Sequence, residues 1–100
     1  MKNVILSADS EKTVYLVSDV VADNLQEYCL KFCNDWIWNS PEAEEYRMDG
    51  GVSYDETDFI RYLNRFVFPN EQSVMVKKFS WLELKDGYPA EYENCPRYNF

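Results

Sequence analysis

The sequence predicts a small α+β domain in which helices cover one face of an antiparallel sheet. Of the 100 residues, 46% are hydrophobic and 17% aromatic, which is enough apolar surface for one compact core. The middle of the chain shows helical periodicity, whereas residues 3–8, 13–17 and 73–84 have the β-rich composition of strands. A chain of this length fits one domain, so residues 1–100 are expected to fold as a single unit.

The first two strands, residues 3–8 and 13–17, are expected to pair as an N-terminal hairpin. Between them lies Asp9-Ser10-Glu11-Lys12, whose residue types favour a turn. The pattern therefore predicts two antiparallel strands joined by a short connection.

A long helix is predicted from residue 18 to residue 37. Ser18 or Asp19 can cap it, because a side-chain oxygen accepts hydrogen bonds from the free N–H groups of the first turn. The apolar residues recur with a period of 3.6 and share one face: Val21, Leu25, Tyr28, Cys29, Phe32, Cys33, Trp36 and Ile37. Cys29 and Cys33 lie on this face, so we expect buried thiols and no bound metal.

Two further helices are predicted. Ser40 and Pro41 mark the start of a short helix that ends near Arg47, before Asp49-Gly50-Gly51. Asp55 is the predicted cap of another long helix, which Pro69-Asn70 ends. Its expected buried face consists of Phe59, Ile60, Leu63, Phe66 and Val67.

Residues 73–84 are predicted to form the last strand, with a bulge where the alternation of Val74 and Val76 gives way to the run 79–84. The tail, residues 88–100, is rich in Pro and Tyr and is expected to be irregular but docked. Its aromatic residues would otherwise be exposed: Tyr88, Tyr92, Tyr98 and Phe100.

The chain lacks most of the residues on which catalysis commonly depends. It contains no histidine, which is the commonest general base and metal ligand. Gly50-Gly51 lacks the rest of any phosphate-binding motif, and no nucleophile motif occurs. Pairs of carboxylates could serve a glycosidase, but acidic pairs are too common here to indicate one. We therefore expect a non-enzymatic protein without a cofactor.

The net charge of −8 disfavours direct binding to nucleic acid or anionic lipid and favours a basic partner. Between residues 34 and 58 the chain carries eight acids and one base, Arg47, whereas residues 61–78 carry four bases and one acid. The predicted partner-binding residues are the eight acids: Asp35, Glu42, Glu44, Glu45, Asp49, Asp55, Glu56 and Asp58. Several of them can be explained as helix caps, but Glu44, Glu45 and Asp49 cannot.

The sequence also indicates the compartment. The N-terminal apolar run is too short for a signal peptide, and no apolar stretch is long enough to span a membrane. Three cysteines form no disulfide framework. We expect a cytoplasmic protein that does not bind membranes.

The chain resembles small acidic proteins of Gram-positive mobile genetic elements. The resemblance lies in Val4-Ile5-Leu6-Ser7-Ala8-Asp9-Ser10, in Asp23-Asn24-Leu25-Gln26-Glu27-Tyr28-Cys29 and in the ending 91–100. In size and charge it is similar to type II-A anti-CRISPR proteins, which inhibit Cas9. That resemblance implies an acidic surface that occupies a basic guide-RNA or DNA channel, and it transfers no individual residue. The alternative is a non-enzymatic accessory interaction module of a plasmid or conjugative element, which uses exposed aromatic residues.

Overall fold

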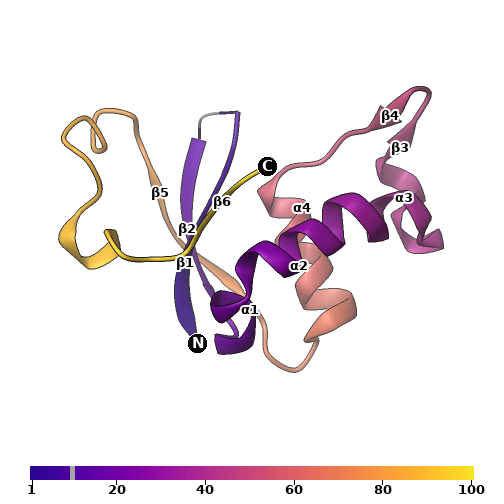
Figure 1. The fold of residues 1–100 in the computed structure, drawn as a ribbon, viewed down its shortest axis with the longest axis horizontal. Coiled ribbons are helices and arrows are strands. Elements are labelled where there is room, and N and C mark those ends of the chain that lie inside the picture. Colours follow the sequence, from indigo (N-terminus) through magenta and orange to yellow (C-terminus); the bar gives the residue numbers. More distant parts are fainter. Residues whose placement is uncertain (10) are drawn as a thin grey trace.

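The computed structural model describes residues 1–9 and 11–100, and it shows the predicted α+β fold (Figure 1). Its strands are β1 (Lys2–Ala8), β2 (Glu11–Val17), β3 (Arg47–Met48), β4 (Gly51–Val52), β5 (Val74–Phe79) and β6 (Arg97–Asn99). Its α-helices are α1 (Asp19–Asp23), α2 (Leu25–Lys31), α3 (Ile37–Asn39) and α4 (Glu56–Tyr62). Two π turns are η1 (Phe32–Trp36) and η3 (Leu63–Val67), and two 3-10 turns are η2 (Pro41–Tyr46) and η4 (Ala90–Tyr92).

The main sheet has four strands in the order β5-β2-β1-β6. The predicted hairpin is confirmed, since β1 and β2 pair antiparallel from Lys2 opposite Val17 to Ala8 opposite Glu11. The turn predicted between these strands includes Ser10, which lies outside the described residues. The predicted strands pair antiparallel as expected, β1 with β2 and β2 with β5, but the sheet as a whole is mixed, because β6 pairs parallel with β1. The chain end thus contributes a fourth strand that local sequence patterns did not indicate.

The predicted first helix is broken into segments. Asn24 leaves helical geometry at φ −134° and ψ 38°, and its side-chain amide donates to the Val20 carbonyl at 2.9 Å. Ser18 occupies the N-cap position, but its buried side chain makes no capping hydrogen bond. Asp19 forms an ion pair with the N-terminal amine at 2.8 Å instead of capping the helix. The predicted apolar face nevertheless packs inward, and both Cys29 and Cys33 are buried as expected.

Both later helix starts are confirmed. The Ser40 hydroxyl accepts a hydrogen bond from the Glu42 N–H, although the segment that follows is the 3-10 turn η2. Asp55 and Asp58 form a reciprocal capping box at the start of α4. The prediction that Phe66 is buried is wrong, because it is exposed in the π turn η3, whose wider winding shifts the residues that follow Tyr62.

The predicted strand of residues 73–84 is shorter than expected. β5 ends at Phe79, and residues 81–86 form turns. The Ser80 and Glu83 side chains each accept a hydrogen bond from the other residue's N–H, at 3.3 and 3.4 Å, which stabilises a turn at this point. The bulge is present but lies at Val76, where the pairing with β2 shifts.

The core occupies both faces of the sheet. The helices cover one face, around a cluster of aromatic rings that includes Phe32, Phe59 and Tyr62. The tail covers part of the other face, where Tyr92 packs on Phe79. The tail is therefore docked as predicted, but η4 and β6 make it more regular than expected.

Candidate functional site

The acidic segment lies mainly at one end of the molecule, where α3, η2 and the β3–β4 hairpin project away from the main sheet (Figure 1). Asp35 lies on η1 immediately before this end, and Asp49 lies in the turn between β3 and β4. Gly50 adopts φ 86° in that turn, a conformation that glycine tolerates and other residues rarely adopt. The small hairpin therefore presents Asp49 at an exposed tip.

Three of the predicted acids are brought together by η2. A 3-10 helix has three residues per turn, so Glu42 and Glu45 lie above one another and Glu44 points in another direction. Ala43 is fully buried and fixes the inner side of the turn, which leaves the three carboxylates exposed. A hydrogen bond from the Ser40 hydroxyl lowers the pKa of Glu42, which keeps this carboxylate charged.

The remaining predicted acids lie at the start of α4 and differ in exposure. Asp55 is exposed, whereas Asp58 is half-buried and forms an ion pair with Arg61 at 3.4 Å. Burial raises the pKa of Asp58, and Arg61 acts in the opposite direction. The pKa of Arg61 is raised mainly by the side chain of Tyr46, the last residue of η2, and more weakly by Asp58 and Glu45.

Glu56 is separated from the exposed acids. Its side chain is only 7% exposed, and its electrostatic neighbours include Glu11 and Lys78 on the main sheet. Burial is the main reason that its pKa is raised, and the nearby carboxylate of Asp55 adds to the effect. The exposed set is therefore Asp35, Glu42, Glu44, Glu45, Asp49 and Asp55, and we call it the acidic surface.

Arg47, the one basic residue of this segment, is directed at the backbone. Its guanidinium donates to the carbonyl oxygens of Trp38 and Ser40 at 2.7 and 2.8 Å. Asp58 is the only one of the eight predicted acids that forms an ion pair within residues 1–9 and 11–100. The carboxylates of the acidic surface are thus solvated but have no cation bound to them in the described part of the chain.

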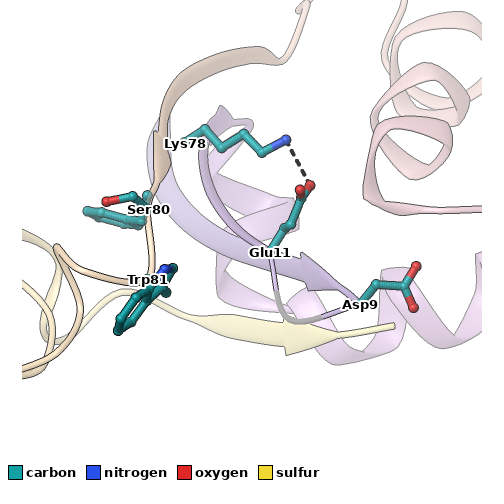
Figure 2. A pocket seen from close by; sticks show the side chains of 6 residues that line it. Asp9, Glu11, Lys78, Ser80 and Trp81 are labelled. Atoms are coloured by element: carbon teal, nitrogen blue, oxygen red, sulfur yellow. Dashed lines mark ion pairs between the residues drawn. The ribbon is translucent and has the colours of Figure 1, made fainter.

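A depression lies elsewhere, where the end of β5 lies beside the start of β2 (Figure 2). It is open to solvent, has a volume of about 540 Å³, and is lined by Asp9, Glu11, Lys78, Phe79, Ser80 and Trp81. Glu11 and Lys78 form an ion pair across 2.8 Å, so their charges are directed at each other. The sequence did not predict this depression, because residues 80–84 were expected to continue the strand. The adjacent apolar residues Trp81 and Leu82 are the only local feature of the sequence that points to it.

The buried cysteines form no cluster of metal ligands. Among the described residues no group of three or more His, Cys, Asp or Glu side chains is arranged to hold a metal ion. Burial raises the pKa of the Cys29 thiol, and burial together with Cys33 raises the pKa of Tyr98 to about 12. The Cys33 sulfur lies 4.0 Å from the Tyr98 hydroxyl. The Cys29 thiol and the Tyr98 hydroxyl therefore stay protonated near neutral pH.

Comparison with known proteins adds no family assignment: no protein-family model, curated protein sequence or solved structure matches this chain. None of the helices in the described ranges has both the length and the apolar character that crossing a membrane requires.

Proposed function

We propose that this protein is a non-enzymatic, stoichiometric inhibitor of a nucleic-acid enzyme, and that the enzyme is Cas9. The observation that supports the proposal is the group of exposed carboxylates on η2 and the β3–β4 hairpin, which have no bound cation among the described residues. In this proposal the acidic surface occupies the basic channel in which Cas9 holds its guide RNA or target DNA. The site of action would be the cytoplasm.

The physical basis is charge complementarity. Duplex DNA carries one negative charge per ~1.7 Å of its axis, and proteins that bind it neutralise phosphates with Lys and Arg. The carboxylates of the acidic surface can take the place of phosphates in such a basic channel. Complementary charge accelerates the encounter between two proteins and makes binding depend on salt. The protein itself, with its net charge of −8, is repelled by nucleic acid.

The test is a Cas9 plasmid-cleavage assay in which wild-type protein and a triple variant are titrated in parallel. The variant carries Glu44→Lys, Glu45→Lys and Asp49→Lys, three exposed positions without helix-capping hydrogen bonds. Exposed substitutions usually shift stability by less than ~0.5 kcal/mol each, so the fold is expected to persist. We expect inhibition to weaken at least tenfold, equivalent to ~1.4 kcal/mol.

A matched control separates local charge from total charge. The control triple is Asp86→Lys, Glu91→Lys and Glu93→Lys, which are also exposed and change the net charge equally. It should retain inhibition within about threefold, less than ~1 kcal/mol. No inhibition by the wild type would remove Cas9 as the target, and equal losses in both triples would remove the acidic surface as the cause.

A second candidate function is favoured by one observation, the exposure of large apolar side chains in the turn that follows β5. Trp81 is 78% exposed and Leu82 is its exposed neighbour, which suits an accessory module that binds a partner through apolar contacts. The salt dependence of partner binding distinguishes the two functions. Binding through the acidic surface should weaken steeply as salt rises, whereas apolar binding should not.

A further inference from the structure

Trp38, on the short helix α3, is exposed within the acidic segment. Its side chain is 49% exposed, although Trp is highly buried on average. Asp35 lies on η1, directly before α3, and Glu42 lies on η2, just after it. The structure describes residues 34–49 in full, and every exposed ionisable side chain among them is acidic. A large aromatic ring is therefore exposed in surroundings that carry one sign of charge.

The indole of Trp38 is held in place by the π turn η1. In a regular α-helix the Cys33 carbonyl would accept a hydrogen bond from the Ile37 N–H, but here that N–H bonds to the carbonyl of Phe32, five residues back. The Cys33 carbonyl accepts the indole N–H of Trp38 instead, at 3.1 Å. The only polar atom of the indole thus has a partner within the chain, and the ring is presented in a fixed orientation.

Arg47, the one basic residue of this segment, does not use the ring. Its half-buried guanidinium donates to the carbonyl oxygens of Trp38 and Ser40, at the end of α3, whereas the indole reaches back toward Cys33. The cation–π contacts of the described residues involve the rings of Phe79 and Tyr88, and none involves Trp38. The Trp38 ring is therefore free to receive a cation from another molecule.

We propose that Trp38 and the carboxylates beside α3 bind an arginine side chain of the basic partner. The guanidinium stacks on the exposed indole, and the neighbouring carboxylates of the acidic surface balance its charge. For the identity of the partner this inference rests on the proposed function, whereas the preference for arginine follows from the site itself.

Ring and charge together select this occupant. Trp is the best aromatic partner for a cation, and a planar guanidinium stacks on aromatic faces as an ammonium group does not. An apolar side chain on Trp38 would remove water from nearby carboxylates without pairing them, which costs free energy. An anionic side chain would be repelled by the same carboxylates. Trp and Arg are also the residues enriched at the energetic centres of protein interfaces.

The first test measures binding of fluorophore-labelled nona-arginine by fluorescence anisotropy at about 50 mM NaCl, where screening is modest. Wild-type protein should bind this peptide, and Trp38→Leu should weaken the Kd about fivefold, because Leu is apolar but has no ring. Trp38→Phe keeps a ring and should stay within about twofold of the wild type. Nona-lysine should bind the wild type more weakly than nona-arginine, and Trp38→Leu should reduce this preference.

Phe66→Leu is the matched control, since Phe66 is 46% exposed against 49% for Trp38 and lies on η3, outside the acidic segment. It should bind nona-arginine as the wild type does. Circular dichroism checks that all of these proteins are folded. Three results would overturn the arginine site: a wild type that does not bind below about 1 mM, a Kd that Trp38→Leu leaves unchanged, or an equal loss in Phe66→Leu or Trp38→Phe.

The second test separates this inference from the proposed function. In the Cas9 cleavage assay, Trp38→Leu should weaken inhibition about fivefold and Trp38→Phe should retain it. If Trp38→Leu inhibits as the wild type does while the Glu44, Glu45 and Asp49 triple variant does not, the acidic surface acts without Trp38 and the arginine site is wrong. If the wild type does not inhibit Cas9 but nona-arginine binding still depends on Trp38, the target is wrong and the arginine site stands.

Discussion

Single residues in this fold show how position decides the chemistry of a carboxylate. Asp55 and Glu56 are adjacent in the sequence, yet Asp55 is exposed and caps α4 while Glu56 is buried against the sheet. Burial in a medium of low polarity disfavours the charged form, which is why the pKa of Glu56 is raised. Lys78 offsets this effect only in part. A charged Glu56 therefore costs stability at neutral pH.

We predict that Glu56→Gln stabilises the protein at pH 7. A carboxyl group whose pKa is raised on folding stabilises the native state below its unfolded pKa, and this stabilisation is lost as the pH rises through the folded value. The neutral amide avoids the loss, so the melting temperature should rise by roughly 2–5 °C at pH 7. The gain should disappear near pH 4. Calorimetry at both pH values measures it, with the exposed Glu44→Gln as a control that should shift little. A destabilised Glu56→Gln variant at pH 7 would contradict this interpretation.

At the scale of elements, the C-terminal tail completes both the sheet and the aromatic core. β6 pairs with β1, and the Phe100 N–H donates to the Ser7 carbonyl at 2.8 Å. The Phe100 ring lies 5.5 Å from that of Phe59 and 6.1 Å from that of Phe32, centroid to centroid. Aromatic contacts of this kind contribute beyond the area they bury. The last residues therefore hold the helices against the sheet.

Deletion of residues 95–100 is expected to destabilise the fold strongly. It removes β6 and the half-buried ring of Phe100, and burial of one large side chain alone contributes roughly 1.5–3 kcal/mol. The melting temperature should fall by more than ~8 °C. Trp81→Ala is the comparison, because Trp81 is exposed and its loss should shift the melting temperature by less than ~3 °C. A deletion variant that melts like the wild type would show that the tail does not support the core.

At the scale of the whole molecule, excess negative charge outweighs the ion pairs. The five ion pairs of the described residues each include a side chain that is at least 40% exposed, and surface pairs of this kind contribute little. The net charge is −8, and the acidic surface concentrates it at one end. Repulsion among like charges in the compact state opposes folding.

Salt should therefore stabilise this protein. Raising NaCl from about 20 mM to about 200 mM shortens the Debye length from roughly 20 Å to roughly 7 Å and screens repulsion more than it weakens exposed pairs. We expect the melting temperature to rise by roughly 2–5 °C. The triple variant Glu44→Lys, Glu45→Lys and Asp49→Lys should respond less, because its net charge is closer to zero. A melting temperature that falls with salt would show that the ion pairs dominate.

Short-range patterns in the sequence determined much of the fold. The β-rich composition of residues 3–8 and 13–17, with turn residues between them, predicted the β1–β2 hairpin, and the 3.6-residue period predicted the buried face that contains Cys29 and Phe32. The starts of η2 and α4 followed from Ser40 and Asp55, because a cap bonds to N–H groups only two or three residues away. Composition alone likewise located the acidic segment.

The tertiary structure decided whatever depends on residues distant in the sequence. β6 exists because β1 offers it a partner some ninety residues away, and the Arg97–Asn99 segment itself has no distinctive strand pattern. Glu56 is not among the exposed acids, because its side chain is buried where α4 lies near Lys78. β5 is an edge strand, because no other described strand pairs with its outer side. Burial and strand order arise from long-range packing, whereas caps and periodicity are local. For this reason the sequence showed where the acidic residues lie along the chain, and only the folded structure showed which of them are exposed.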